Sequence, residues 1–293
     1  MTRAKRYRLG LDIGGTKIAG VLLLNNKVVE NSVLATPKDT LDHFLIMSQA
    51  VLEPLLHKVE KNKGEIIGLG IGIPGVIDIP KQKIINVPNV PILNKQKLGE
   101  LLKERLNMPN LNCLMDNDVN CFIRAEAVLG AGRKSNNVYG LTIGTGIGGG
   151  WWYNGDVYYG AYNAAGEPGH MVIDADNGLT LQQAYNKLTQ NNAATLAQEA
   201  YRGDRLAEKS FEEFGKYLGT ALSTIVNIID PEIIIMGGGV MSSGDLFLTS
   251  AKESLAKYTF TPQARTTKLV KGKLGPMAGA IGAALLPKEK SKE

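Results

Sequence analysis

The apolar positions of this chain form short blocks separated by turn residues, and their spacing predicts alternating strands and helices. Residues 7–33 predict a strand followed by a hairpin, and residues 40–62 have helical spacing. A continuous apolar run at 66–73 predicts a buried strand, after which the chain enters a Pro-rich segment at 79–93. This first part of the chain therefore predicts the opening meander of a mixed sheet with a helix packed on it.

The rest of the pattern repeats this order. The predicted elements are a helix near 96–107, a strand at 112–115, a helix from Asp118, a hairpin over 138–153, helices over 180–229, a strand at 233–236 and a final helix after Pro276. Two halves with the same order predict two α/β domains, residues 1–122 with 277–293 and residues 123–276. In this division the final helix crosses back to the first domain.

A glycine corner interrupts the first hairpin. The apolar strand ends at Asp12 and turns at Gly14 and Gly15, and Thr16 and Lys17 follow directly. Glycines let backbone N–H groups approach phosphate oxygens, and a carboxylate at a strand end reaches a hydrated metal ion. The spacing is not that of a P-loop, and a strand follows where a P-loop has a helix. The corner therefore predicts either a phosphate-binding hairpin of the actin-like ATPase type or an ordinary tight hairpin.

A second corner of the same kind lies in the other half. There the apolar strand LTI leads into Gly144, Thr145 and Gly146, and another strand follows. Two matching corners about one domain length apart indicate an internal duplication, in which each half contributes one phosphate-holding hairpin. The predicted architecture is the actin-like ATPase (ribonuclease H-like) α/β fold, with two mixed-sheet domains around a cleft.

Charge and composition narrow the classes of function. The net charge is +5; four basic residues among the first eight and the segment 288–293 account for it, so residues 9–287 are neutral overall and no nucleic-acid groove is expected. No apolar run approaches the roughly 18 residues of a membrane span, and no secretory leader is recognisable, so we expect a cytoplasmic protein without a membrane partner. Cys113 and Cys121 fall in apolar surroundings and are expected to be core residues in a reducing compartment.

Seven short strings occur in an order that resembles the ROK family (repressor, open reading frame, kinase), specifically its glucokinase-type sugar kinases. They are DIGGTK at 12–17, GIGIPG at 70–75, PNVP at 88–91, DNDVN at 116–120, GTGIG at 144–148, GEPGH at 166–170 and DPEIIIMGGG at 230–239. The resemblance covers essentially the whole chain and implies an enzyme that uses ATP and Mg²⁺ to phosphorylate a hexose. The expected reaction is at the 6-hydroxyl of glucose; fructose, mannose, allose and N-acetylmannosamine are the alternative substrates.

Phosphoryl transfer needs an in-line hydroxyl and a group that accepts its proton. Asp118 is the candidate base, because it lies at a strand-to-helix junction where the helix dipole favours a carboxylate, and the family's catalytic aspartate falls on it. Its alternative role is a helix N-cap. The neighbouring Asn117 offers a donor and an acceptor to vicinal hydroxyls and contacts sugar in the family; the alternative is a turn-forming residue. Asp116 is expected to be structural.

The resemblance also implies sugar contacts elsewhere. Glu167 and His170 are expected to bind ring hydroxyls. Gly75 and Asn89 are expected to complete the sugar pocket through a backbone N–H and a side-chain amide, unless their Pro-rich surroundings form a plain surface loop.

Three glycines that follow the strand at 233–236 resemble the family's adenosine-binding loop, where absent side chains admit a flat ring. A simple strand-to-helix turn is the alternative. The full predicted nucleotide site is Asp12, Gly14, Gly15, Thr16, Lys17, Gly144, Thr145, Gly146, Gly237, Gly238 and Gly239, with Asp12 as the ligand of Mg²⁺ through water.

One segment departs from the family pattern. ROK kinases usually carry a zinc-binding cysteine loop shortly after the Gly-His pair and then a sugar-binding Glu. Residues 178–185, GLTLQQAY, contain no cysteine, so zinc is not expected, and Gln183 is expected at the position of that Glu. Four apolar residues recur near helical spacing and are expected to hold the segment by packing instead: Leu179, Leu181, Tyr185 and Leu188.

The sequence also has to be compared with what proteins of other functional classes would need. A non-catalytic sugar sensor of the same fold would not need Asp118, and a filament or chaperone ATPase would not need Asn117, Glu167 and His170. A DNA-binding repressor of the family would carry a helix-turn-helix before the first corner, and only a few residues precede it here, so that class is not expected. The resemblance further implies a homodimer. Polyphosphate or a nucleotide other than ATP is the alternative phosphoryl donor.

Overall fold

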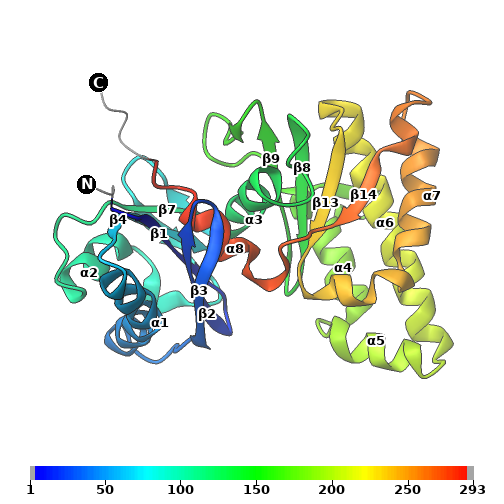
Figure 1. Cartoon of the computed structure of the whole chain (residues 1–293). Helices are drawn as coiled ribbons and strands as arrows, with labels where there is room; N and C mark the ends of the chain where they lie inside the picture. Colours follow the sequence, from blue (N-terminus) through cyan, green and yellow to red (C-terminus); the bar gives the residue numbers. More distant parts are fainter. Residues whose placement is uncertain (1–3, 289–293) are drawn as a thin grey trace. The chain divides into compact units, whose positions relative to one another are not determined.

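The computed structural model describes residues 4–288, and the chain divides into two compact units, each with its own sheet and core (Figure 1). The first unit is Met1–Gly130 with Leu274–Glu293, and the second is Ala131–Lys273. The boundary expected after residue 122 falls inside helix α3 (Asp118–Val128), which belongs to the first unit. The final helix, α8 (Ala278–Ala284), belongs to the first unit as well.

The first unit is built on a five-stranded mixed sheet with the order β3-β2-β1-β4-β7. Its strands are β1 (Arg6–Ile13), β2 (Lys17–Leu24), β3 (Lys27–Ala35), β4 (Glu65–Ile73) and β7 (Cys113–Asn117). β1 is antiparallel to β2 and parallel to β4, and β4 is parallel to β7. The carboxyl ends of β1, β4 and β7 therefore meet at one edge, where the register aligns Asp12 with Gly72 and Gly72 with Asp116.

Helices pack on both faces of this sheet, which explains why its central strands are apolar on both sides. A Cβ at Gly10 or Gly70 would collide with backbone atoms of α8, so these glycines allow that helix to lie directly on the sheet. The opposite face is covered by α1 (Leu41–Lys61), which contacts Gly20 of β2 through Val51 and Leu55. The unit also contains α2 (Leu98–Arg105), the hairpin β5 (Val76–Asp78) and β6 (Lys83–Asn86), and the 3-10 turns η1 (Pro91–Leu93) and η5 (Gly275–Met277).

The second unit repeats the plan of the first sheet. Its strand order is β10-β9-β8-β13-β14, in which β8 is antiparallel to β9 and parallel to β13, and β13 is parallel to β14. The strands are β8 (Asn137–Ile143), β9 (Ile147–Tyr153), β10 (Asp156–Val157), β13 (Ile233–Gly237) and β14 (Lys268–Lys271), with a small separate sheet of β11 (Val172–Asp174) and β12 (Leu179–Thr180). The expectation of mixed α/β sheets is therefore confirmed.

Four longer helices belong to the second unit: α4 (Leu181–Thr189), α5 (Ala193–Tyr201), α6 (Arg205–Ile229) and α7 (Leu248–Tyr258). Three short 3-10 segments connect them to the strands: η2 (Pro168–His170), η3 (Gly239–Leu246) and η4 (Ala264–Thr266). Phe211 and Phe214 of α6 pack with Phe247 in the core of this unit. Between residues 4 and 288, no helix is both long and apolar enough to cross a membrane.

Candidate functional site

Asp12 lies at the carboxyl end of β1 in a confined place. A Cβ at Gly72 would be 3.3 Å from its Oδ1, and one at Gly279 would be closer still to the carboxylate. Burial and the neighbouring carboxylate of Asp118 raise the pKa of Asp12 to about 7, although Lys17 opposes the rise. Two carboxylates that repel each other favour a bound cation, and carboxylate oxygen is the ligand that Mg²⁺ prefers, so the donor set fits this ion.

The first glycine corner is a tight turn held by backbone hydrogen bonds. The N–H of Gly14 donates to the carbonyl oxygen of Lys17 at 2.9 Å, and the hydroxyl of Thr36 donates to the carbonyl oxygen of Gly14 at 2.8 Å. Thr16 and Lys17 are exposed at the tip. A Cβ at Gly15 would lie 3.1 Å from Cβ of Asn89, so the structure brings the predicted phosphate corner next to a predicted sugar ligand within the first unit.

The junction of β7 and α3 carries Asn117 and Asp118. Asn117 is the N-cap of α3, because its Oδ1 accepts hydrogen bonds from the N–H groups of Val119 at 2.8 Å and Asn120 at 3.3 Å. The same side chain donates through Nδ2 to the carbonyl oxygen of Gly75 at 3.2 Å. Asp118 Oδ1 accepts from the N–H of Val119 at 3.0 Å. Capping is therefore the task of Asn117, and the alternative reading of Asp118 as the N-cap is not supported.

The backbone at position 75 accommodates only a glycine. Its φ is +126°, and a Cβ there would collide with the carbonyl oxygen of Asn86. A side-chain hydrogen bond also holds the segment that follows β6: the N–H of Val87 donates to Oδ1 of Asn94 at 2.7 Å. Within the first unit, the structure thus gathers five predicted positions around the carboxyl ends of β1, β4 and β7: Asp12, Gly75, Asn89, Asn117 and Asp118.

In the second unit, Glu167 and His170 flank the 3-10 turn η2. Both side chains are exposed, and the N–H of His170 donates to the carbonyl oxygen of Glu167 at 3.3 Å. Desolvation raises the pKa of the Glu167 carboxyl, and His170 opposes the rise. The hydroxyl of Tyr139 donates to the carbonyl oxygen of Gly166 at 2.9 Å, which ties the turn to β8.

Gln182 and Gln183 are neighbours at the start of α4, and their side chains have different partners. Gln183 is exposed and closes a capping box: its N–H donates to Thr180 Oγ1 at 3.3 Å, and its Oε1 accepts from the N–H of Thr180 at 2.9 Å. Gln182 Oε1 instead accepts from the N–H of Ile147 at 2.7 Å, next to the second corner. A Cβ at Gly169 of η2 would lie 3.6 Å from the same oxygen. Gln182 therefore connects the corner with the turn that carries His170.

The second corner is supported by α4 and lies beside the adenosine-type glycines. The hydroxyl of Tyr185 donates to the carbonyl oxygen of Gly144 at 2.7 Å, and the N–H of Gly144 donates to the carbonyl oxygen of Gly146 at 2.9 Å. β8 and β13 are in register at Thr142 and Gly237, so Gly144, Thr145 and Gly146 lie at the same sheet edge as Gly237, Gly238 and Gly239. Gly238 has φ +89°, and open space surrounds the Cβ position of Gly239.

Packing holds the segment that lacks the cysteine loop. Leu181 is fully buried and Tyr185 is 3% exposed, while Leu179 is half-buried. Over residues 4–288 there is no group of three or more His, Cys, Asp or Glu residues that could hold a metal ion. Burial raises the pKa of the Cys113 thiol to about 11 and that of Cys121 well above its ordinary value, as expected of core thiols. The absence of zinc stays a prediction.

Comparison with known proteins places these features in a family. The sequence matches the ROK family profile over residues 8–182 and 178–290. N-acetylgalactosamine kinase AgaK of Shewanella sp. (strain ANA-3) is 32% identical over 313 residues, which cover 94% of this chain and 95% of that protein. N-acetyl-D-glucosamine kinase of Escherichia coli O127:H6 is 31% identical over 307 residues, which cover 94% of this chain and 98% of that protein.

A solved structure shows the same fold. The ROK family glucokinase from Streptomyces griseus, in complex with glucose and AMPPNP, aligns with a TM-score of 0.76 at 24% identity, over 96% of this chain and 99% of that one. The predicted actin-like ATPase fold is thereby confirmed.

Proposed function

The chain belongs to the ROK family and is a sugar kinase, and we propose that it transfers the γ-phosphoryl group of ATP to the 6-hydroxyl of glucose. The observation that carries the proposal is that Asp12, Asn117 and Asp118 lie together at one edge of the first sheet. Phosphoryl transfer to a sugar needs three groups in one place: a ligand for the metal ion, a residue that binds the acceptor hydroxyl, and a base. ATP as the donor is supported by the Streptomyces griseus structure, which holds its analogue AMPPNP.

In the proposed reaction the hexose oxygen attacks the γ-phosphorus, the bond to the bridging oxygen of ADP breaks, and the hydroxyl proton passes to the carboxylate of Asp118. Asn117 orients the acceptor, because its amide is already held by α3 and Gly75. Mg²⁺, when bound, neutralises charge on the phosphate oxygens, and Asp12 would hold it. Backbone N–H groups of the first corner, with Thr16 and Lys17, would bind phosphate oxygens.

We assign the remaining contacts with the nucleotide and the sugar to residues of the second unit. Gly144, Thr145 and Gly146 would bind phosphate, and Gly237 to Gly239 would admit the adenine ring, which the open space at Gly239 permits. Glu167 and His170 would bind sugar hydroxyls. Gln182 is the better candidate for an additional contact in this region, because Gln183 already uses its amide to cap α4.

A 2-acetamido hexose is the second candidate substrate. The observation that favours it is the identity of 31–32% to kinases named for N-acetylglucosamine and N-acetylgalactosamine. Glucose and its acetamido derivatives share ring hydroxyls, so the contacts proposed for Glu167 and His170 would serve both kinds of sugar.

The test is a coupled ADP-release assay with glucose, N-acetylglucosamine, N-acetylgalactosamine, N-acetylmannosamine, mannose, fructose and allose, beside a control without sugar. The proposal expects ATP turnover only with sugar, and the highest kcat/KM with glucose. The highest kcat/KM with an acetamido sugar would establish the second candidate. Equal turnover without sugar would contradict a sugar kinase and indicate an ATPase of the same fold.

A further inference from the structure

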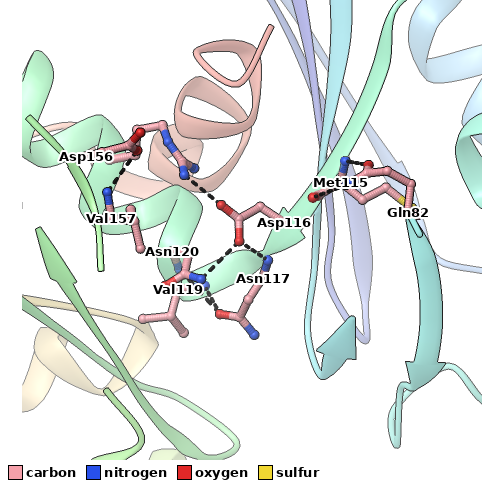
Figure 2. Close-up of polar contacts among 9 residues, drawn as sticks. Gln82, Met115, Asp116, Asn117, Val119, Asn120, Asp156 and Val157 are labelled. Atoms are coloured by element: carbon pink, nitrogen blue, oxygen red, sulfur yellow. Dashed lines mark hydrogen bonds and ion pairs between the residues drawn. The ribbon is translucent and has the colours of Figure 1, made fainter. Parts of the chain in front are cut away.

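Asp116 is a buried acid that the reaction described above does not use. It is 0% exposed at the end of β7, and its carboxylate accepts hydrogen bonds from the start of α3 and from Arg124 (Figure 2). Oδ1 accepts from the N–H of Asn117 at 2.8 Å and from Nδ2 of Asn120 at 3.0 Å, while Oδ2 accepts from Arg124 at 2.7 Å. Burying a carboxylate is costly, so this arrangement needs a compensating role or a full set of partners.

The partner Arg124 lies eight residues later, on α3, and is 5% exposed. Its guanidinium reaches back along the helix to the strand end. The ion pair therefore joins β7 to the body of α3, across the junction where Asp118 begins the helix. The Asn120 contact adds a second link from the same carboxylate to the first turn of α3.

The strand itself is fixed independently of Asp116. β7 is an edge strand, and its outer side is paired by the side chain of Gln82: the N–H of Met115 donates to Oε1, and Nε2 donates to the carbonyl oxygen of Met115 at 3.4 Å (Figure 2). Asn117 caps the helix. What remains for Asp116 is the orientation of the helix start relative to the strand.

We propose that Asp116 is a positioning residue, which acts through its ion pair with Arg124 and its hydrogen bonds to Asn117 and Asn120 to hold the Asp118 carboxylate in line with the acceptor hydroxyl. The proposal rests on the proposed function, because it acts through Asp118 as the base. A misplacement of about 1 Å at a reacting group costs roughly 10²-fold in rate, so a loosened junction is expected to lower kcat far more than it changes sugar binding.

A double-mutant cycle tests this coupling. Asp116→Asn is made in the wild-type chain and in Asp118→Asn, and kcat, the sugar dissociation constant and the midpoint of urea unfolding are measured for all four proteins. We expect Asp116→Asn to lower kcat roughly 10- to 100-fold in the wild type and less than about 2-fold in Asp118→Asn, because the group it positions is already gone. Its effect on the unfolding midpoint is expected to be equal in both backgrounds.

Asp116→Asn removes the negative charge that faces the buried Arg124 guanidinium. The double variant Asp116→Asn/Arg124→Gln therefore takes its place in the cycle if the single variant does not fold. Glu232→Gln is the matched control. Its carboxylate accepts the N–H groups of Asn136 and Asn137 at 2.8 and 3.0 Å in the second unit, so its loss should lower stability and leave kcat unchanged.

Three results would overturn the proposal, and they separate it from the proposed function. Equal kcat losses from Asp116→Asn in both backgrounds would show that Asp116 does not act through Asp118. An unchanged kcat for Asp116→Asn in the wild type would reduce Asp116 to a stabilising role. Full activity of Asp118→Asn would instead overturn the base assignment, and the positioning role with it.

Discussion

The side-chain amide of Asn117 donates a hydrogen bond of 3.2 Å to the carbonyl oxygen of Gly75, 42 residues earlier in the chain. The same amide caps α3 through its oxygen. One side chain therefore links the start of the helix that carries Asp118 to the loop that follows β4, and both lie at the sheet edge where Asp12 is found.

Asn117→Ala removes both links at once. We expect the free energy of unfolding to fall by about 1–2 kcal/mol through the lost N-cap. The KM for sugar should rise at least about 10-fold, because the proposed contact of Asn117 with the sugar is lost and Gly75 loses its support. Urea unfolding and steady-state kinetics measure the two effects. Asn192→Ala, which removes the N-cap of α5, is the control: it should cost similar stability without changing the KM for sugar. Equal KM values in the two variants would contradict the prediction.

Asp118→Asn should lower kcat by about 10²–10⁴-fold, the usual cost of losing a general base. The amide keeps the size and much of the hydrogen bonding of the carboxylate, so the sugar dissociation constant measured by isothermal titration should change little. A variant that retains more than about a tenth of the wild-type kcat would rule out Asp118 as the base.

Asp12 gives the ligand-free protein a pH-dependent stability. Its folded pKa of about 7 lies above the ordinary value of 3.8, so the folded state binds the proton more tightly, and stability is lost as the pH rises through this range. Asp12→Asn should therefore raise the free energy of unfolding at pH 8 by about 1–3 kcal/mol, with a smaller gain at pH 5. The same variant should lose most of its kcat/KM for ATP.

The Asp12 experiment is urea unfolding of the ligand-free protein at both pH values. Asp174→Asn is the control, because the carboxylate of this half-buried residue accepts hydrogen bonds that lower its pKa, and its loss should bring no gain at pH 8. No stability gain for Asp12→Asn at pH 8 would show that its ionisation is not costly in the folded protein.

Gly75→Ala tests the loop beside Asn117. The φ of +126° and the collision with Asn86 should together lower the free energy of unfolding by about 1–3 kcal/mol and weaken sugar binding. Gly155→Ala is the matched control, since Gly155 also has a positive φ, +90°, but open space at its Cβ position. It should lose less stability, because only the positive φ is shared, and it should keep normal sugar affinity. Normal sugar affinity in Gly75→Ala as well would remove this loop from the proposed sugar site.

Metal removal tests the segment that replaces the cysteine loop. Activity lost on treatment with EDTA should return with Mg²⁺ alone, and metal analysis of the purified protein should find no stoichiometric zinc. One tightly bound zinc ion per chain would contradict the prediction that packing alone holds the segment around α4.

Local patterns were enough to predict the two glycine corners, the order of the main strands and helices, and Asp12 at a strand end. The site roles of Asn117 and Asp118 were predicted from the family resemblance as well, and they stay predictions. Continuous apolar runs and Gly-rich turns depend on the residues next to them in the chain, so the sequence reveals them directly. The parallel pairing of β1, β4 and β7 then follows from the alternation with helices, and it brings the ends of these strands together.

The sequence by itself determined which chemical groups stand at the ends of the strands, but only the tertiary structure decided the task of each. Asn117, and not Asp118, caps α3; Gln182, and not Gln183, lies against the second corner. Neighbouring residues at a helix start point about 100° apart, so a difference of one position changes every partner of a side chain. The ion pair between Asp116 and Arg124 likewise forms only when β7 and α3 pack together. Burial and pairing depend on tertiary packing and not on which residues are adjacent in the sequence.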